Sequence, residues 1–278
     1  MSFKKYSIYF FILFIFLSFN LKGQSLGKLF IIGGGDRPDF LMIKMLEESN
    51  LLNGGYGIIL PMASSEPDSA IYYTKKQLEK LGASIKGFDF SGNKMPTIAQ
   101  LDSLKNAKLI YFTGGDQNKL MKSIKEKKIY DIIWQCYQKG GMIAGTSAGA
   151  AVMSKKMITG NEKKYKDYTQ TFKTIEADNI EIGEGMGFLS RSIVDQHFLI
   201  RSRHNRLLSA VIEYPMDLCV GIDESTAILV KNNEAEVVGS SQVVVLKNQK
   251  SKKNQKNKLF AENIKLSIYI QGMKFKIK

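Results

Sequence analysis

The chain has 278 residues, of which 44% are hydrophobic, and this is enough to bury a sizeable core in one large domain or two small ones. Its two cysteines and two histidines exclude a disulfide-rich scaffold and offer no spacing typical of a metal site. The net charge of +14 favours an acidic partner, but no recognition motif or interleaved aromatic residue accompanies the basic run at 247–258, so no nucleic-acid partner is expected.

The first 23 residues differ from the rest of the chain. Lys4 and Lys5 precede an apolar run at 6–17 that is short for a membrane span, and small and polar residues follow up to Gly23. This order predicts a signal peptide cleaved near Gly23, and hence an exported (periplasmic or secreted) protein without a stable membrane anchor. A retained anchor helix is the alternative. Cleavage would remove three lysines and lower the net charge to +11.

Strand-like apolar runs alternate with amphipathic helical patterns in the first half of the remaining chain. This βαβα order predicts a mostly parallel sheet flanked by helices on both faces. Functional residues of such a sheet gather beyond the carboxyl ends of its strands, where 33–36, 114–117 and Ser147 all fall. The expected strands are 28–32, 56–61, 84–90, 108–112 and the run before Ser147, and the expected helices are 38–48, 66–81, 98–105, 118–138 and about 148–153.

The second half of the chain has a looser pattern. A polar stretch rich in lysine and tyrosine, 161–177, reads as a loop that flanks the site, and 247–258 as a solvated loop, with binding to an acidic surface as its alternative. We expect one domain over 24–278, ending in this basic extension. The other expected elements are the strand-like run 192–198, a helix over 200–213, a strand over 219–224, a hairpin of 227–231 with 236–246, and one or two strands within 266–277.

The residues around Ser147 have the pattern of a nucleophile elbow. Gly145 and Gly149 allow a strand and a helix to pass close together while the serine hydroxyl points outward. Backbone N–H groups near this serine can stabilise the negative oxygen of a tetrahedral intermediate, and the candidates are Ala148, at the helix start, and Gly114–Gly115, beyond a neighbouring strand. A tight turn of small residues is the alternative interpretation.

The triple glycine at 33–35 follows the first strand, where dinucleotide-binding loops occur. Its continuation lacks the third glycine of that motif and has Pro38 instead, so nucleotide binding is not expected. Close approach of the backbone beside the active site is the better explanation of these glycines.

A serine nucleophile needs a general base, and the chain contains only two histidines. His197 follows a strand-like run at the edge of a loop, whereas His204 lies inside an expected helix, so His197 is the predicted base. Spacing alone does not choose the acid that orients it, although Asp223 and Glu224 lie at the carboxyl end of an apolar strand. The candidates are Asp167, Glu176, Asp195, Asp223 and Glu224.

Four short motifs stand in a distinctive order between residues 27 and about 244. They are Thr113-Gly-Gly-Asp-Gln117, Gly145-Thr-Ser-Ala-Gly-Ala150, Asp195-Gln-His-Phe198 followed by three arginines, and Gly221-Ile-Asp-Glu-Ser-Thr-Ala227. Together they resemble the S51 serine peptidases, and the third motif favours the cyanophycinases over aspartyl dipeptidase (peptidase E). The resemblance implies a class I glutamine-amidotransferase-like or flavodoxin-like three-layer α/β sandwich with a nucleophile elbow.

The resemblance also implies residue roles. Ser147 would be the nucleophile, His197 the base and Glu224 its carboxylate partner. The implied substrate is cyanophycin, a polyaspartate with an arginine on each side-chain carboxyl, cut to β-Asp-Arg dipeptides without a metal or organic cofactor. The residues expected to line the substrate pocket are Gln117, Asp195, Gln196, Arg201, Arg203 and Arg206.

These residue types suit such a substrate. Arginine recognises carboxylates in paired geometry, and Asp195 is expected to meet the substrate guanidinium. Arg203 and Arg206 would share a helix face, whereas Arg201 would point elsewhere unless it precedes the first turn. An aspartyl dipeptidase for short Asp-X peptides and a catalytically silent binding protein are the alternative functions. A homodimer would be unsurprising in this family.

Overall fold

The computed structural model describes residues 26–167, 169–248, 250 and 254–278. The expected signal peptide lies outside the described residues, as does part of the lysine-rich run. Within these ranges, no helix has the length and apolar character needed to cross a membrane.

The main sheet has eight strands, five of which run parallel and are connected through helices, as the alternating pattern predicts. The other three extend it in antiparallel fashion on one side. In spatial order the strands are β16 (Lys274–Lys276), β11 (Glu234–Gly239), β10 (Thr226–Lys231), β1 (Leu29–Ile32), β5 (Met142–Thr146), β4 (Leu109–Phe112), β2 (Gly57–Leu60) and β3 (Ile85–Gly87).

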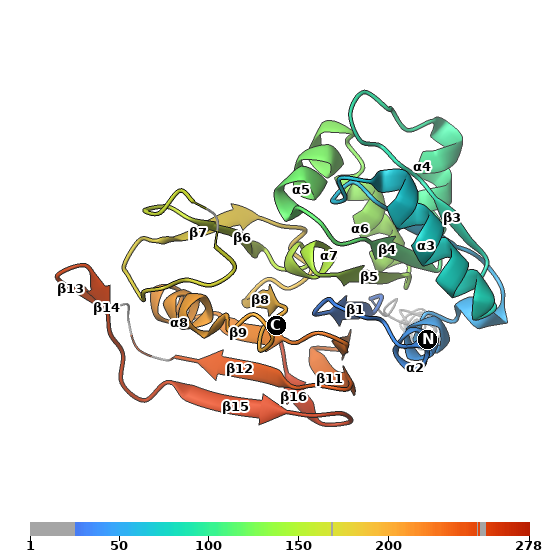
Figure 1. Ribbon diagram of the computed structural model, residues 1–278. Coiled ribbons are helices and arrows are strands. Elements are labelled where there is room, and N and C mark those ends of the chain that lie inside the picture. The colour runs from blue at the N-terminus through green and yellow to red at the C-terminus, as the bar shows by residue number, and fades with distance from the viewer. Residues whose placement is uncertain (1–25, 168, 249, 251–253) are drawn as a thin grey trace, which may run out of the picture.

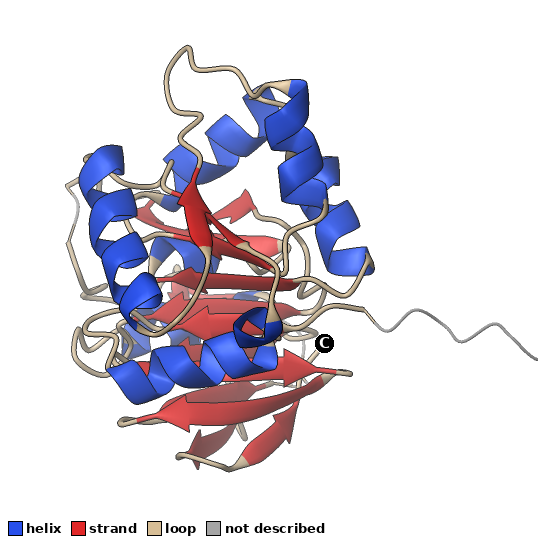
Figure 2. Ribbon diagram, turned by 90° about the vertical axis from the view of Figure 1, so that its right-hand side faces the viewer, coloured by secondary structure: helices blue, strands red, loops and turns tan. Residues whose placement is uncertain are grey.

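Helices cover both faces of this sheet, and Figure 2 shows the stacked strands with helices on either side. Strand β1 is buried on both faces: Phe30 and Ile32 pack in one core, and Leu29 and Ile31 in the other. The predicted three-layer α/β arrangement is therefore confirmed. One face carries α2 (Asp39–Glu48), the short η1 (Leu51–Asn53) and α3 (Pro67–Lys80), and the other carries α4 (Ile98–Lys105), α5 (Gln117–Glu126), α6 (Tyr130–Gln138) and α7 (Ala148–Ala151).

A second sheet, which the sequence pattern did not predict, lies beside the first (Figure 1). Its order is β15 (Lys265–Tyr269), β12 (Val243–Lys247), β9 (Leu218–Ile222) and β8 (Ser192–Gln196), and only β8 and β9 are parallel. Helix α8 (His204–Glu213) packs on it through Leu207 and Val211. Two small hairpins complete the described chain: β6 (Lys156–Glu162) with β7 (Ile180–Glu184), and β13 (Asn254–Gln255) with β14 (Lys258–Leu259).

The clearest errors of extent concern three predicted elements. The helix expected over 118–138 is two helices, because Lys128 takes a left-handed conformation (φ 54°) and the N–H of Ile129 bonds to the carbonyl of Ile124, which ends α5 as a Schellman motif. The helix expected from residue 200 begins at His204. The hairpin arm expected over 236–246 is divided at Gly239 (φ 141°), so that β11 and β12 belong to different sheets.

Strand register brings four segments to one place. Ile32 pairs with Thr146 and Phe112 with Gly145, so β1, β4 and β5 end together. In the second sheet Gln196 pairs with Ile222, so β8 and β9 also end together. The amide of His197 donates to the Gly33 carbonyl at 2.7 Å and connects the two sheet edges. The glycine loop, the serine, the histidine and the acidic pair after β9 therefore meet at one site.

Candidate active site

Ser147 lies on a strained turn between β5 and α7. Its φ of 54° and ψ of −109° fall outside the regions that a serine ordinarily adopts. A Cβ at Gly145 would lie 2.4 Å from the Gly149 carbonyl oxygen, and one at Gly149 would lie 2.6 Å from that of Phe112. Both flanking positions therefore require glycine, which is the geometry of a nucleophile elbow.

The serine, one histidine and one glutamate form a hydrogen-bonded chain. His197 Nε2 lies 2.8 Å from Ser147 Oγ, and His197 Nδ1 lies 2.5 Å from Glu224 Oε1. This arrangement suits a neutral ring that is protonated at Nδ1 and accepts the serine hydroxyl at Nε2. Ser147 therefore has a base within reach, and that base has an orienting carboxylate.

The environment of His197 favours its neutral form. Burial lowers the pKa of this imidazole, the hydrogen bond with Glu224 partly raises it again, and the charges of Arg201 and Arg203 lower it further. A neutral imidazole is the form that can take a proton from a hydroxyl, so the ring is suited to act as a base over a wide range of pH.

The glycine loop after β1 packs against this hydrogen-bonded chain. A Cβ on Gly34 would lie 2.3 Å from His197 Cε1, and one on Gly35 would lie 2.5 Å from Glu224 Oε2. The expectation that these glycines allow close backbone approach beside the site is confirmed. Their absent side chains leave the space that the imidazole and the carboxylate occupy.

The backbone amides near Ser147 that make no backbone hydrogen bond within the described chain include those of Gly114, Gly115 and Ala148. A Cβ on Gly114 would be 3.4 Å from that of Ser147, so this residue lies directly against the serine. Gly115 is in a glycine-only conformation (φ 136°) and packs on the carbonyl of Ala63. The loop after β4 is thereby held where its amides can face an oxyanion.

The other candidate acids have different partners. Asp223 accepts backbone N–H bonds from Leu199 and Ile200, each at 3.0 Å. The carboxylate of Glu176 accepts from Lys258 at 2.8 Å, and Asp167 is exposed. Of the five acids that spacing left open, Glu224 is the one that the structure brings to His197.

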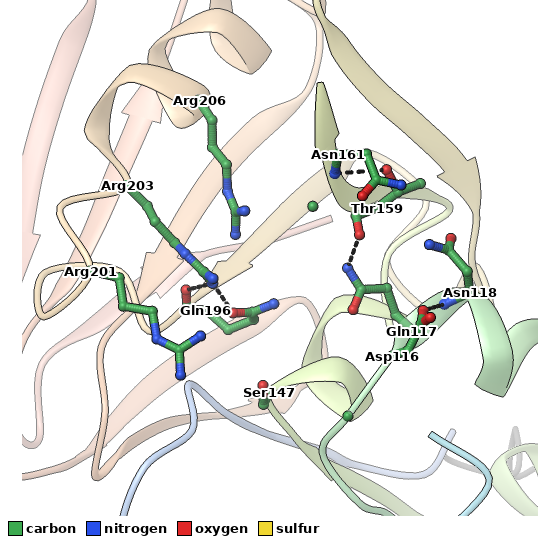
Figure 3. A pocket seen from close by; sticks show the side chains of 12 residues that line it. Asp116, Gln117, Asn118, Ser147, Thr159, Asn161, Gln196, Arg201, Arg203 and Arg206 are labelled. Carbon is green, nitrogen blue, oxygen red and sulfur yellow. Dashed lines mark hydrogen bonds between the residues drawn. The ribbon is translucent and has the colours of Figure 1, made fainter. Parts of the chain in front are cut away.

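A cavity of about 280 Å³ opens beside Ser147 (Figure 3). In this view Arg201, Arg203 and Arg206 lie on one side of it and residues of the β4–α5 loop and β6 on the other, with Ser147 at the bottom. We call it the arginine cavity. Its lining residues are Gly115, Asp116, Gln117, Asn118, Ser147, Thr159, Gly160, Asn161, Gln196, Arg201, Arg203 and Arg206.

The three arginines are held differently. Arg206 is fully buried and forms a two-pronged ion pair with Asp195, in which Nε donates to Oδ2 at 2.7 Å. Its NH1 group has no acceptor among the described residues. Arg203 donates to the carbonyl and side-chain oxygens of Gln196. Arg201 precedes the first turn of α8, which explains how it reaches the same cavity as the other two.

The position of Asp195 differs from the expectation that this residue meets the substrate. The residue is 1% exposed, its carboxylate is bound by Arg206, and it is not part of the cavity lining. The expected contact between Asp195 and a substrate guanidinium is therefore wrong. Asp195 instead holds the Arg206 guanidinium in place.

Gln117, Gln196 and Ser147 lie together in the lining of the arginine cavity, where the family resemblance places them. Gln117 Nε2 donates to the carbonyl of Ile158 at 3.0 Å and so joins α5 to the β6 hairpin. Thr159 and Asn161, which line the cavity from β6, were not predicted from the sequence. No motif marks them, because their position depends on the pairing of β6 with β7. His204 is exposed and packs on Phe198, away from Ser147.

No group of three metal-ligating side chains occurs within the described ranges. Cys136 and Cys219 are both buried as free thiols, and burial raises the pKa of Cys136 to about 12. These thiols are therefore protonated at neutral pH and packed in the interior, away from Ser147.

Comparison with known sequences gives consistent matches. Residues 29–238 match the profile of Peptidase family S51. A cyanophycinase of a Nostoc species is 33% identical over 195 residues, which cover 69% of this chain and 63% of that protein. One of Geminocystis herdmanii is 34% identical over 177 residues, covering 60% and 61%, respectively. The chain thus spans less than two thirds of the length of these two relatives.

Two solved structures have a similar fold. A peptidase from an acI-B1 Actinobacterium has a TM-score of 0.67 at 23% identity, over 92% of this chain and 98% of that one. A putative peptidase E protein from Listeria monocytogenes has a TM-score of 0.57 at 20% identity, over 78% and 100%. At these identities the likeness concerns the fold alone.

Proposed function

The chain belongs to peptidase family S51 and is a serine-type peptidase, and on this basis we propose that it hydrolyses cyanophycin, or a related β-aspartyl-arginine polymer, to β-Asp-Arg dipeptides. The observation that carries the proposal is the cluster of three arginines, Arg201, Arg203 and Arg206, that lines the cavity beside Ser147. Arginine side chains bind carboxylates with paired, charge-assisted hydrogen bonds, so this cluster suits a substrate that carries carboxylates.

The proposed reaction uses Ser147, His197 and Glu224. Ser147 Oγ attacks the amide carbonyl carbon while His197 Nε2 takes its proton, and the carbonyl oxygen becomes an oxyanion that faces the amides of Gly114 and Ala148. The C–N bond then breaks, and the imidazolium returns its proton to the leaving nitrogen. Water, deprotonated by the same imidazole, hydrolyses the acyl-enzyme ester. Glu224 holds the Nδ1–H and stabilises the imidazolium throughout.

The charges around the arginine cavity complement an aspartyl-arginine unit. Each such unit carries a carboxylate and a guanidinium. Arg201, Arg203 and Arg206 offer positive charge on one side, and the carboxylate of Asp116 lies on the other. Asp116 Oδ1 caps α5 by accepting from the amide of Asn118 at 2.7 Å. Oδ2 accepts no hydrogen bond from the described residues, so it can accept one from a substrate guanidinium.

The cavity volume of about 280 Å³ also suits a short peptide, which favours aspartyl dipeptidase activity as the second candidate. This activity would use the same three catalytic residues. It is preferred if soluble Asp-X dipeptides are hydrolysed and the polymer is not. The hydrogen-bonded serine, histidine and glutamate argue against a silent binding protein.

We further propose that the protein is exported. The proposal is supported by the lysines, apolar run and polar boundary of residues 1–23. Expression in a bacterial host followed by mass spectrometry of the exported protein should find a new N-terminus near Gln24. Retention of residues 1–23 on a membrane-bound product would contradict cleavage.

The test of substrate is incubation of the mature protein with insoluble cyanophycin. Release of β-Asp-Arg dipeptides, measured by mass spectrometry, is expected, and a metal chelator should leave it unchanged. Ser147→Ala should release none while retaining the thermal stability of the native protein. Intact polymer after prolonged incubation with the active enzyme would reject cyanophycin as the substrate.

A further inference from the structure

A second cavity, of about 360 Å³, lies on the other side of the Ser147 turn from the arginine cavity. Gly114 and Thr146 line it, whereas the residues that follow each of them, Gly115 and Ser147, line the arginine cavity. Gly35, which packs against Glu224, borders it as well. A peptide bound across Ser147 can therefore extend into both cavities. We call the second one the Arg37 pocket.

Arg37 is the one cation that lines this pocket within the described chain. Its NH1 group donates to the hydroxyls of Tyr111 at 3.1 Å and Thr74 at 3.3 Å, both of which are buried and uncharged. The side chain of Gln77 donates to its backbone carbonyl at 2.6 Å. The guanidinium is thus held in one orientation by neutral groups on β4 and α3.

The charge of Arg37 is not neutralised by the described residues. No carboxylate among them lies within ion-pair distance, and its Nε and NH2 groups have no acceptor among them. That edge of a guanidinium is the one that binds a carboxylate with two parallel hydrogen bonds. A held arginine with this edge unused is suited to a ligand carboxylate.

The rim of the pocket has the opposite character. Glu66 and Tyr73 both line it and both are exposed, and Tyr73 is 65% exposed. An acid and an aromatic face are the groups that bind a guanidinium, by ion pairing and by cation–π contact. The pocket therefore has a cation, Arg37, in its interior and two groups that can bind a guanidinium, Glu66 and Tyr73, at its rim.

We propose that the Arg37 pocket binds a second aspartyl-arginine unit, on the opposite side of the cleaved bond from the unit in the arginine cavity. Arg37 binds a carboxylate of this unit, and Glu66 and Tyr73 bind its guanidinium. The proposal rests on the proposed function and assigns the residues that recognise two consecutive units. The carboxylate is either that of the arginine or that at the end of the polyaspartate chain.

The test compares native enzyme, Arg37→Gln and Glu66→Gln on a peptide of two β-Asp-Arg units. Arg37→Gln should raise KM about ten- to a hundredfold, because a charge-assisted hydrogen bond is lost, with kcat within about threefold. Arg191→Gln is the matched control, since Arg191 is exposed and lines a different cavity, and its KM should not change. Thermal unfolding of each variant checks the fold.

Three modified peptides identify the contacts. One peptide is amidated at the chain-terminal carboxylate, and another at the arginine carboxylates. The peptide that lacks the carboxylate bound by Arg37 should give the same KM with native enzyme and with Arg37→Gln. Replacement of arginine by the uncharged citrulline should abolish the effect of Glu66→Gln. An Arg37→Gln KM equal to that of the native enzyme, or an effect that persists in both amidated peptides, overturns the proposal.

A binding measurement separates this proposal from the proposed function. Ser147→Ala and the Ser147→Ala/Arg37→Gln double variant are titrated with the two-unit peptide by calorimetry. Weaker binding by the double variant supports binding of the second unit in the Arg37 pocket. If the native enzyme nevertheless cleaves no such peptide, only the proposed function is rejected. Equal binding by the two proteins rejects the pocket whether or not cleavage occurs.

Discussion

Gly34→Ala should inactivate the enzyme by displacing the imidazole of His197, the proposed base. The added methyl carbon would lie 2.3 Å from His197 Cε1 and 2.4 Å from Nε2. Carbon atoms in ordinary contact are about 3.5 Å apart, so the ring must move by roughly 1.2 Å. A displacement of about 1 Å in a reacting group costs on the order of 100-fold in rate, or about 2.7 kcal/mol of barrier. We therefore expect kcat to fall at least 100-fold.

The same substitution also strains the backbone, since φ at Gly34 is 117°. Gly54→Ala is the matched control, because φ there is 102° and a Cβ would meet nothing within 4 Å. Both variants should lose about 1–3 kcal/mol of unfolding free energy in urea, but only Gly34→Ala should lose activity against a β-Asp-Arg peptide. Activity of folded Gly34→Ala within a few-fold of the native enzyme would refute the reasoning.

Three further outcomes are expected. In steady-state kinetics, His197→Ala should lower kcat by about 10²- to 10⁴-fold or more, whereas His204→Ala, at an exposed position, should change kcat less than tenfold. A similar loss of kcat in both variants would mean that the base is misassigned. Because Arg201 lowers the pKa of His197, Arg201→Gln should move the acidic limb of the kcat/KM profile to higher pH, and an unmoved or lower limb would contradict that electrostatic effect. Asp195→Asn should cost about 3–5 kcal/mol in urea unfolding because it leaves buried Arg206 without its carboxylate, and native-like stability would argue against this role.

The main sheet could be predicted because each central strand carries its own signal. β1, β2, β4 and β5 are short apolar runs buried along their whole length, and glycine or proline follows most of them closely. Ser147 and its flanking glycines could be recognised for the same reason, since the elbow is a local structure. The strand order then brings separate loops to one edge.

Other features depend on contacts between distant parts of the chain. The end of α5 uses Lys128 where helices usually place glycine, so no residue type marked it. Asp195 pairs with Arg206, which lies eleven residues later in the chain. This pairing depends on the packing of α8 on the second sheet. Spacing alone could not select Glu224 among five acids, because the choice depends on the parallel register of β8 with β9. That selection came from resemblance to a family.

The most direct test of serine catalysis is covalent labelling of Ser147. The native protein is treated with diisopropyl fluorophosphate, and the modified residue is identified by peptide mass spectrometry. One label on Ser147 is expected, formed in parallel with loss of peptidase activity, and His197→Ala should slow labelling by at least 100-fold because the base is gone. Inactivation with the label on another residue, or labelling of Ser147 at the same rate in His197→Ala, would contradict the proposed mechanism.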